Sequence, residues 1–220
     1  MKFQRDLNRI SDPDRMTRKR GLQKLLDDLP WGKRSQRDEL NDFIKYHLLP
    51  VIITHISDTV EKCREVSVEI IKKCLEKCDS IDIHHLGQMI EQLCSRVNEV
   101  PFPEASEEIR LQVLEIVLMI KIYLDVMHNK GHIQATERDK LIELMLQSLC
   151  KVLSDSFPSV KRICAEIICS VVTTSPVLLR SYYKQLLKTL LLNATHQHSK
   201  TRVATLQAIG QGLILSLIHI

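Results

Sequence analysis

The sequence predicts an all-α protein in which antiparallel helix pairs stack one on the next. Apolar residues recur at helical spacing through most of the 220 residues, and no alternation of Val, Thr and Tyr between turn clusters indicates a strand. Six glycines and only 4% aromatic residues suit a core of Leu, Ile and Val packed between helices. A short charged motif also recurs with a period in the forties, which is typical of HEAT repeats. We therefore expect a HEAT-type α-solenoid, a right-handed superhelix of about five repeats.

The recurring motif has an acidic residue, a basic residue six positions later and a small residue three further on. The clearest copy is Asp58, Arg64 and Ser67. The other copies are Asp12/Arg18/Gly21, Glu104/Arg110/Val113, Asp155/Lys161/Cys164 and a weaker His196/Arg202/Thr205. The basic members step by 46, 46, 51 and 41 residues.

This spacing suits a hinge between the two helices of a pair. The hinge acid can cap the second helix and reach the base of the neighbouring repeat, while the small residue lets helices approach closely. We expect a structural row of partly buried ion pairs and call it the hinge ladder. Its predicted members are Asp12, Arg18, Asp58, Arg64, Glu104, Arg110, Asp155, Lys161 and Arg202.

The repeats are predicted at residues 1–30, 38–78, 82–128, 134–174 and 178–214. In the first, Asp12-Pro13-Asp14 begins a helix with an acidic N-cap and Pro in its first turn, and Pro30 ends it. In the second, Pro50 falls inside the first helix and is expected to bend it.

In the third repeat, helices are predicted over 84–97 and 104–127, joined by the loop Val100-Pro101-Phe102-Pro103 and ended by a glycine C-cap at Gly131. The last two repeats carry helices over 137–153, 159–174, 178–193 and 199–214. Residues 215–220 form an apolar tail without the polar face of a terminal repeat, so we expect a truncated chain.

The sequence favours a soluble protein of the cytosol or the nucleus. Met1 to Asp6 lacks the apolar core of a signal peptide, and the apolar stretch 111–127 is interrupted by four polar or charged residues. The seven cysteines include no CxxC pair and sit mostly at apolar helical positions, as reduced thiols do.

Catalytic and metal motifs are missing from the sequence. It contains no GxSxG, GxxxxGK[ST], HExxH or GxGxxG. The only histidine clusters, His84-His85 and His196-Gln197-His198, have no acid or cysteine at ligand spacing. We expect no enzyme activity and no metal or other cofactor.

A repeat array instead offers a long surface to another protein. The outward positions of the second helices are the candidate partner-binding residues, and exposure to solvent explains them equally well: Glu65, Glu69, Lys72, Lys73, Glu76, Gln112 and Glu115. Residues 1–37 hold eleven Lys and Arg against five Asp and Glu, which leaves nucleic acid as a less favoured partner.

Three segments resemble the N-terminal HEAT array of the dynein axonemal assembly factor 5 family. They are the fifth-repeat hinge His196-Gln197-His198 with Lys200-Thr201-Arg202-Val203-Ala204, the loop Pro103-Glu104-Ala105-Ser106-Glu107-Glu108-Ile109-Arg110, and Leu48-Leu49-Pro50 through Asp58 to Arg64. LSDSFPSVKRICAEII agrees in pattern, and the resemblance covers roughly residues 14–214.

The resemblance implies a non-catalytic cytoplasmic scaffold that assists pre-assembly of axonemal dynein arms for motile cilia. It implies dynein chains, chaperones or other assembly factors as partners. The alternatives are a HEAT adaptor of another class, for nuclear transport or phosphatase assembly, and a nucleic-acid-associated HEAT protein.

Overall fold

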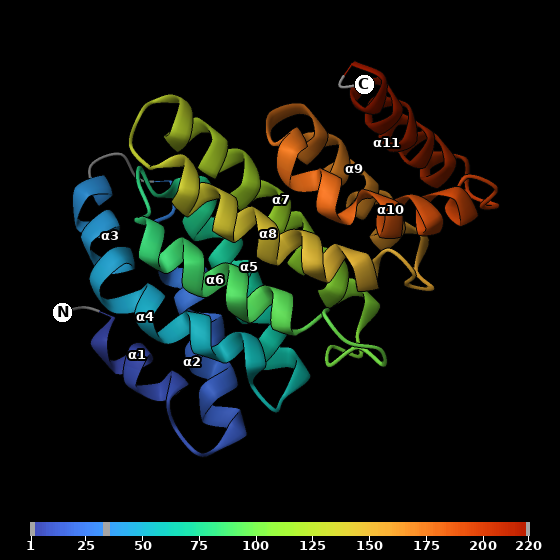
Figure 1. Ribbon diagram of the computed structural model, residues 1–220. Coiled ribbons are helices and arrows are strands. Elements are labelled where there is room, and N and C mark those ends of the chain that lie inside the picture. The colour runs from blue at the N-terminus through green and yellow to red at the C-terminus, as the bar shows by residue number, and fades with distance from the viewer. Residues whose placement is uncertain (1–2, 33–35, 219–220) are drawn as a thin grey trace. The chain divides into compact units, whose positions relative to one another are not determined.

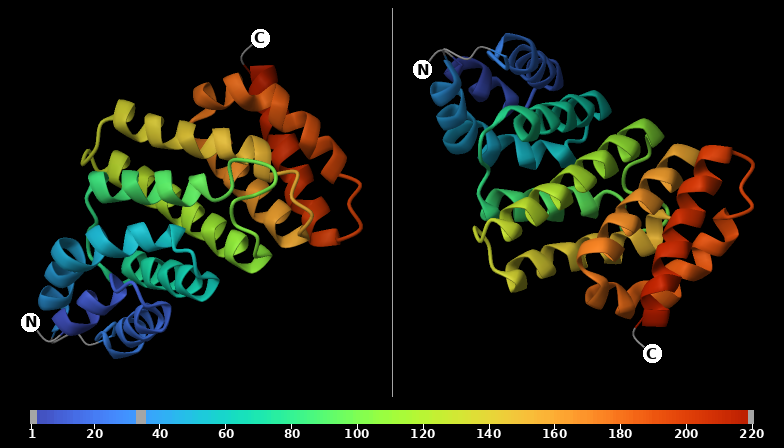
Figure 2. Two further views of the ribbon diagram at one scale, coloured as in Figure 1. Left: turned by 90° about the horizontal axis from the view of Figure 1, so that it is seen from below. Right: turned by 90° about the horizontal axis from the view of Figure 1, so that it is seen from above.

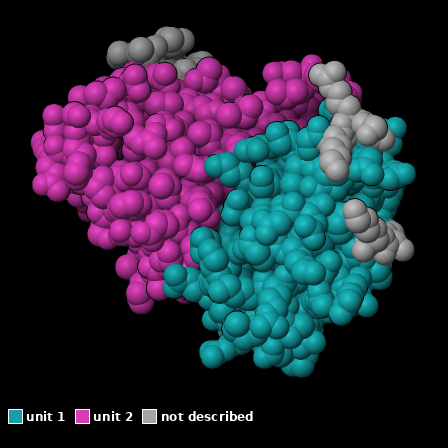
Figure 3. All heavy atoms as spheres, turned by 180° about the vertical axis from the view of Figure 1, so that it is seen from behind, with its two compact units in different colours: residues 1–92 teal, residues 93–220 magenta. Residues whose placement is uncertain are grey.

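The computed structural model describes residues 3–32 and 36–218, with side chains up to Leu213. Within those ranges the chain forms helices joined by turns and contains no strand, which confirms the all-α prediction (Figure 1). The chain divides into two compact units, Met1–Gln92 and Leu93–Ile220 (Figure 3).

Unit 1 begins with a short helix, α1 (Gln4–Ile10), packed against α2 (Arg15–Asp28). The helix α5 (Glu61–Lys77) packs against α2 and against the 3-10 segment η3 (Ile53–Ser57) that comes just before α5 in the chain. Most of the residues of α5 from 63 to 74 are buried. The helix α6 (Ile83–Ser95) starts in this unit and ends in the next.

The segment between α2 and α5 is not one regular helix. It runs as α3 (Arg37–Phe43), a π-helical turn η2 (Ile44–Leu48), α4 (Leu49–Ile52) and a 3-10 segment η3 (Ile53–Ser57). The break falls beside Pro50, as expected, because proline has no N–H for the helical ladder and its ring crowds the preceding turn.

Gly21 lies where α2 crosses α1. A β-carbon at this position would stand 2.8 Å from Cβ of Arg9 and 3.0 Å from Cγ2 of Ile10. The small residue in each copy of the motif is buried in the same way; the others are Ser67, Val113, Cys164 and Thr205. The motif therefore marks close packing of its helix in both units.

Unit 2 contains α7 (Glu107–Asn129), α8 (Ala135–Val152), α9 (Pro158–Thr174), α10 (Pro176–Asn193) and α11 (Ser199–Ile218). The second helices pack in series, α7 on α9 and α9 on α11, and the first helices α8 and α10 pack on each other (Figure 2). In an α-solenoid, the second helix of each pair packs on the second helix of the next pair, and first helices pack on first helices in the same way.

Two helix ends in unit 2 differ from the expected bounds by three residues or more, and the others by at most two. α7 begins after Ser106, whose hydroxyl accepts the amide of Ile109 at 3.5 Å, so Glu104 lies before the helix. α11 continues to Ile218, so residues 215–218 of the expected tail are helical, and 219–220 lie outside the described residues. Gly131, with a φ of 74°, follows the C-cap of α7 as the glycine stop predicts.

Trp31, the single tryptophan, follows the end of α2. Its indole N–H donates to the carbonyl of Leu26 at 2.8 Å. This bond uses a carbonyl in the last turn of α2, where helical partners run out.

Candidate functional site: the hinge ladder and the helix faces beside it

The first ion pair of the hinge ladder joins Arg18 of α2 to Asp58, just before α5. Arg18 donates through Nε to Oδ2 of Asp58 at 2.8 Å and through Nη2 to Oδ1 at 3.0 Å. Its third nitrogen, Nη1, donates to the carbonyls of Asp12 and Pro13 at 3.1 and 2.9 Å. One guanidinium thus closes its own hinge and binds the hinge of the next repeat.

This pair lowers the pKa of the Asp58 carboxyl. Burial acts in the opposite direction, but the hydrogen bonds from Arg18, from the amide of Val60 and from His55 hold the pKa below its ordinary value. The same carboxylate raises the pKa of Arg18, against the effect of burial. Both side chains are therefore charged at neutral pH.

Unit 2 repeats this geometry around Arg110. Arg110 donates through Nε and Nη2 to Oδ2 and Oδ1 of Asp155, at 2.6 and 3.0 Å. Its Nη1 donates to the carbonyls of Glu104 and Ala105, at 3.0 and 2.8 Å. The side chains of Arg110 and Asp155 are 7% and 0% exposed, so this pair lies away from solvent.

The hinge carboxylates do not cap their helices in the expected way. Each accepts the amide two residues further on, which belongs to the N-cap residue and not to the first helical turn. The four bonds are Asp12 to Asp14 at 2.8 Å, Asp58 to Val60 at 2.8 Å, Glu104 to Ser106 at 3.1 Å and Asp155 to Phe157 at 2.8 Å. The acid shapes the turn that leads into the helix.

The last hinge shows why the motif survives without an acid. Arg202 donates through Nη1 to the carbonyls of His196 and Gln197, at 2.8 and 2.9 Å. This is the bond pattern of Arg18 and Arg110 in their own hinges. The six-residue spacing therefore reflects a bond to backbone carbonyls, for which the side chain at the first position need not be acidic.

Lys161 does not reach the His196 hinge, which the recurring spacing indicated as its neighbour. Its Nζ donates to Oδ1 of Asn193 at 3.1 Å, and Asn193 in turn donates to the carbonyl of Leu153 at 3.0 Å. Asn193, at the end of α10, is 3% exposed. An amide takes the place of the carboxylate here because it can both accept from the lysine and donate to a carbonyl.

Three other predicted members of the hinge ladder make the following contacts. The Asp12 carboxylate has no basic partner among residues 3–32 and 36–213; it accepts only the amide of Asp14. Arg64 donates through Nη1 to the carbonyl of Asp58 at 3.0 Å. Glu104 is fully buried and its Oε2 lies 3.4 Å from Nη2 of Arg96.

The candidate partner-binding residues lie on α5 and α7. On α5, Glu69 and Glu76 are exposed, and Glu65 is paired with Lys62 at 2.8 Å. The remaining candidates are half-buried: Lys72, Lys73, Gln112 and Glu115. Only part of the set is therefore open to a large partner, and its role stays a prediction.

Sequence reasoning missed a buried lysine on α7. The Lys121 side chain is 0% exposed and its Nζ donates to Oδ2 of Asp125, the carbonyl of Ser170 and Oγ1 of Thr174, at 2.5, 2.8 and 2.6 Å. It ties α7 to α9. Its position three before the buried Leu124 places it on the apolar face of the helix, which is the signal that could have identified it.

Two other kinds of site are absent from the described part of the chain. No group of three or more His, Cys, Asp or Glu side chains is placed there to hold a metal ion. No described helix has the length and apolarity needed to span a bilayer. The charged residues of the hinge ladder instead join the hinges of neighbouring repeats, as Arg18 does with Asp58 and Arg110 with Asp155.

Comparison with known proteins gives the same architecture and a family. An engineered protein with 11% sequence identity superimposes with a TM-score of 0.66, covering 96% of this chain and 79% of that protein, which bears on the fold alone. Curated relatives from Xenopus laevis and Drosophila melanogaster, both named dynein axonemal assembly factor 5, are 28% and 27% identical over 210 and 209 residues. These alignments cover 94% and 92% of this chain, and the chain spans 23% of each relative.

The family model described as dynein axonemal assembly factor 5-like, TPR repeats, matches residues 9–217. The steps of 41 to 51 residues between hinge bases exceed the 34 residues of a TPR unit and are closer to HEAT length. With nearly the whole sequence matched, the chain belongs to the dynein axonemal assembly factor 5-like family.

Proposed function

We propose that this chain is a non-catalytic scaffold that assists cytoplasmic pre-assembly of axonemal dynein arms for motile cilia. The family match over residues 9–217 carries the proposal, because it joins the chain to relatives named for dynein assembly. The repeat fold supports a binding role over an enzymatic one, since its charged clusters hold hinges together.

The partners we propose are axonemal dynein chains, chaperones or other assembly factors. They would lie along the outward faces of the second helices, where Glu69 and Glu76 of α5 are exposed. Acidic positions on such a face favour a partner segment with basic residues.

The test is a quantitative pull-down from the cytosol of differentiating ciliated cells, with the chain as bait. A variant with Glu69→Lys and Glu76→Lys should recover less dynein chain or chaperone than the wild type. Asp42→Lys with Glu91→Lys, two exposed acids on the first helices α3 and α6, is the charge-matched control and should recover the wild-type amount.

Recovery of a different cargo, such as nuclear-transport or phosphatase subunits, without dynein chains or chaperones would contradict the proposal. It would favour the alternative of a HEAT adaptor of another class. Equal losses in both variants would remove α5 from the binding face while leaving the scaffold role in place.

A further inference from the structure

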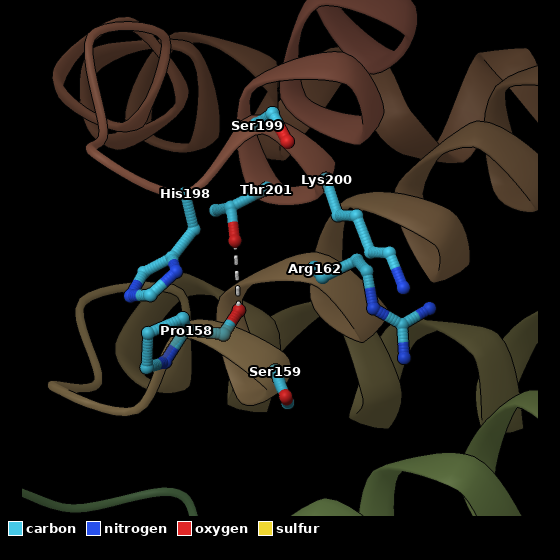
Figure 4. A pocket seen from close by; sticks show the side chains of 7 residues that line it. All are labelled: Pro158, Ser159, Arg162, His198, Ser199, Lys200 and Thr201. Atoms are coloured by element: carbon cyan, nitrogen blue, oxygen red, sulfur yellow. Dashed lines mark hydrogen bonds between the residues drawn. The ribbon is translucent and has the colours of Figure 1, made fainter.

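A small surface cleft lies between the first turn of α9 and the first turn of α11. Its cavity volume is about 280 Å³. The lining residues are Pro158, Ser159, Arg162, His198, Ser199, Lys200 and Thr201. Thr201 closes its floor by donating through Oγ1 to the carbonyl of Pro158 at 3.1 Å, and Arg162 and Lys200 extend together on one side of this bond with His198 on the other (Figure 4).

The charges that line the cleft are positive and largely free to act on a ligand. Lys200 and His198 are exposed, and Lys200 makes no ion pair within the described residues. Arg162 gives one nitrogen, Nη1, to Glu166 at 2.5 Å, and its Nε and Nη2 have no acceptor in the described structure. The hydroxyls of Ser159 and Ser199 add two neutral donors at the rim.

The neighbouring hinge adds to this field. Burial lowers the pKa of the His196 imidazole, and Lys161, His198 and Arg202 each lower it further. A group whose protonation is opposed by three neighbours reports a positive local potential. The cleft therefore attracts an anion before any contact forms.

Size and lining select among anions. The volume is below the range of about 300–1,000 Å³ typical of pockets for whole small molecules, so a side-chain-sized group fits better than a nucleotide. No Phe, Tyr or Trp lines the cleft to stack a base. Guanidinium, ammonium and hydroxyl donors together match the three oxygens and near-double charge of a phosphate ester.

We propose that this cleft binds a phosphorylated side chain of a protein partner. The proposal goes beyond the dynein-arm scaffold role and does not depend on it, since any phosphorylated partner would serve. It gives the array a contact that a kinase acting on the partner could switch on.

The test uses three fluorescein-labelled pentapeptides of Gly and Ser that differ only at the central residue: phosphoserine, serine or glutamate. Binding to the 220-residue chain is followed by fluorescence anisotropy. The phosphopeptide should bind, and the serine and glutamate peptides should bind at least about tenfold more weakly, because each lost charge-assisted bond costs roughly a factor of ten. Inorganic phosphate should compete.

The matched variants separate the cleft from general charge. Arg162→Gln with Lys200→Gln should weaken phosphopeptide binding about tenfold or more. Arg180→Gln with Lys184→Gln removes the same charge from exposed positions of α10 and should leave it within about twofold. Ser199→Asp is a further variant: an acid in the first turn favours α11 yet repels phosphate, so loss of binding there is not loss of fold.

Four outcomes would overturn the proposal. They are no phosphopeptide binding, an equal loss in the α10 control, glutamate peptide binding as tight as phosphopeptide, and tighter binding of a short RNA with the same dependence on Arg162 and Lys200. The last would assign the cleft to a nucleic acid backbone.

Discussion

Replacing Asp155 with alanine leaves the guanidinium of Arg110 buried without its carboxylate. The wild-type pair is bidentate, and its two side chains are 7% and 0% exposed. Removing one partner of a buried ion pair costs about 3–5 kcal/mol of unfolding free energy. Arg110 keeps its bonds to the carbonyls of Glu104 and Ala105, so we expect the lower end, about 3 kcal/mol.

The measurement is urea unfolding followed by circular dichroism at the helical band, with wild type and variant compared at pH 7. Glu166→Gln is the control, because its partner Arg162 and Glu166 itself are 33% and 37% exposed. An exposed pair contributes at most about 1 kcal/mol. The variant should therefore lose at least about three times as much stability as the control.

A second variant tests the cause. Arg110→Met combined with Asp155→Ala removes the unpaired charge, so the double change should cost less than the sum of the two single changes. If Asp155→Ala costs no more than Glu166→Gln, the pair does not hold the hinges together. The hinge ladder would then be incidental to the stability of unit 2.

Two other changes test packing and charge in the same assay. In Gly21→Ala the new β-carbon would stand 2.8 Å from Cβ of Arg9, which costs about 1–3 kcal/mol in overpacking, while helix propensity returns about 1 kcal/mol. The expected net loss of stability is up to about 2 kcal/mol, and a net gain would mean that α1 moves aside freely. Burial lowers the pKa of Lys121 from its ordinary 10.5. Between the lowered pKa and about 10.5, the lysine is protonated in the unfolded chain and neutral in the folded chain. The free energy of unfolding therefore rises with pH across this window. The stability difference between wild type and Lys121→Met should therefore change in favour of wild type across this window, and a difference independent of pH would refute the assignment.

The helical class and the hinge positions could be predicted because both depend on local spacing. Arg18, Arg110 and Arg202 each bind carbonyls five and six residues earlier in their own hinges, and that bond needs only a fixed loop length. The repeat therefore leaves a mark in the sequence even where His196 replaces the acid.

The partners across repeats could not be read in the same way. Lys161 binds Asn193, 32 residues on, where Arg18 and Arg110 bind acids 40 and 45 residues on. The length of the intervening helix and loop decides which residue arrives opposite the base, and a helix can change length by a turn without altering its apolar pattern. The ion pairs and hydrogen bonds between repeats can therefore be identified only from the three-dimensional structure.

The cleft at the start of α11 could not be predicted from the sequence for another reason. The segments that carry Arg162 and Lys200 are 38 residues apart, and each reads alone as an ordinary solvated helix start. Only the packing of α9 on α11 brings the two charges to one place.

Trp31 gives the molecule a built-in optical label. Its indole is anchored to the last turn of α2, inside unit 1, and no other residue of the chain emits as tryptophan does. Emission from Trp31 therefore reports the melting of residues 1–92, while the helical signal of circular dichroism sums both units. Comparing the two unfolding transitions in a hinge variant shows whether unit 1 unfolds before the rest of the chain.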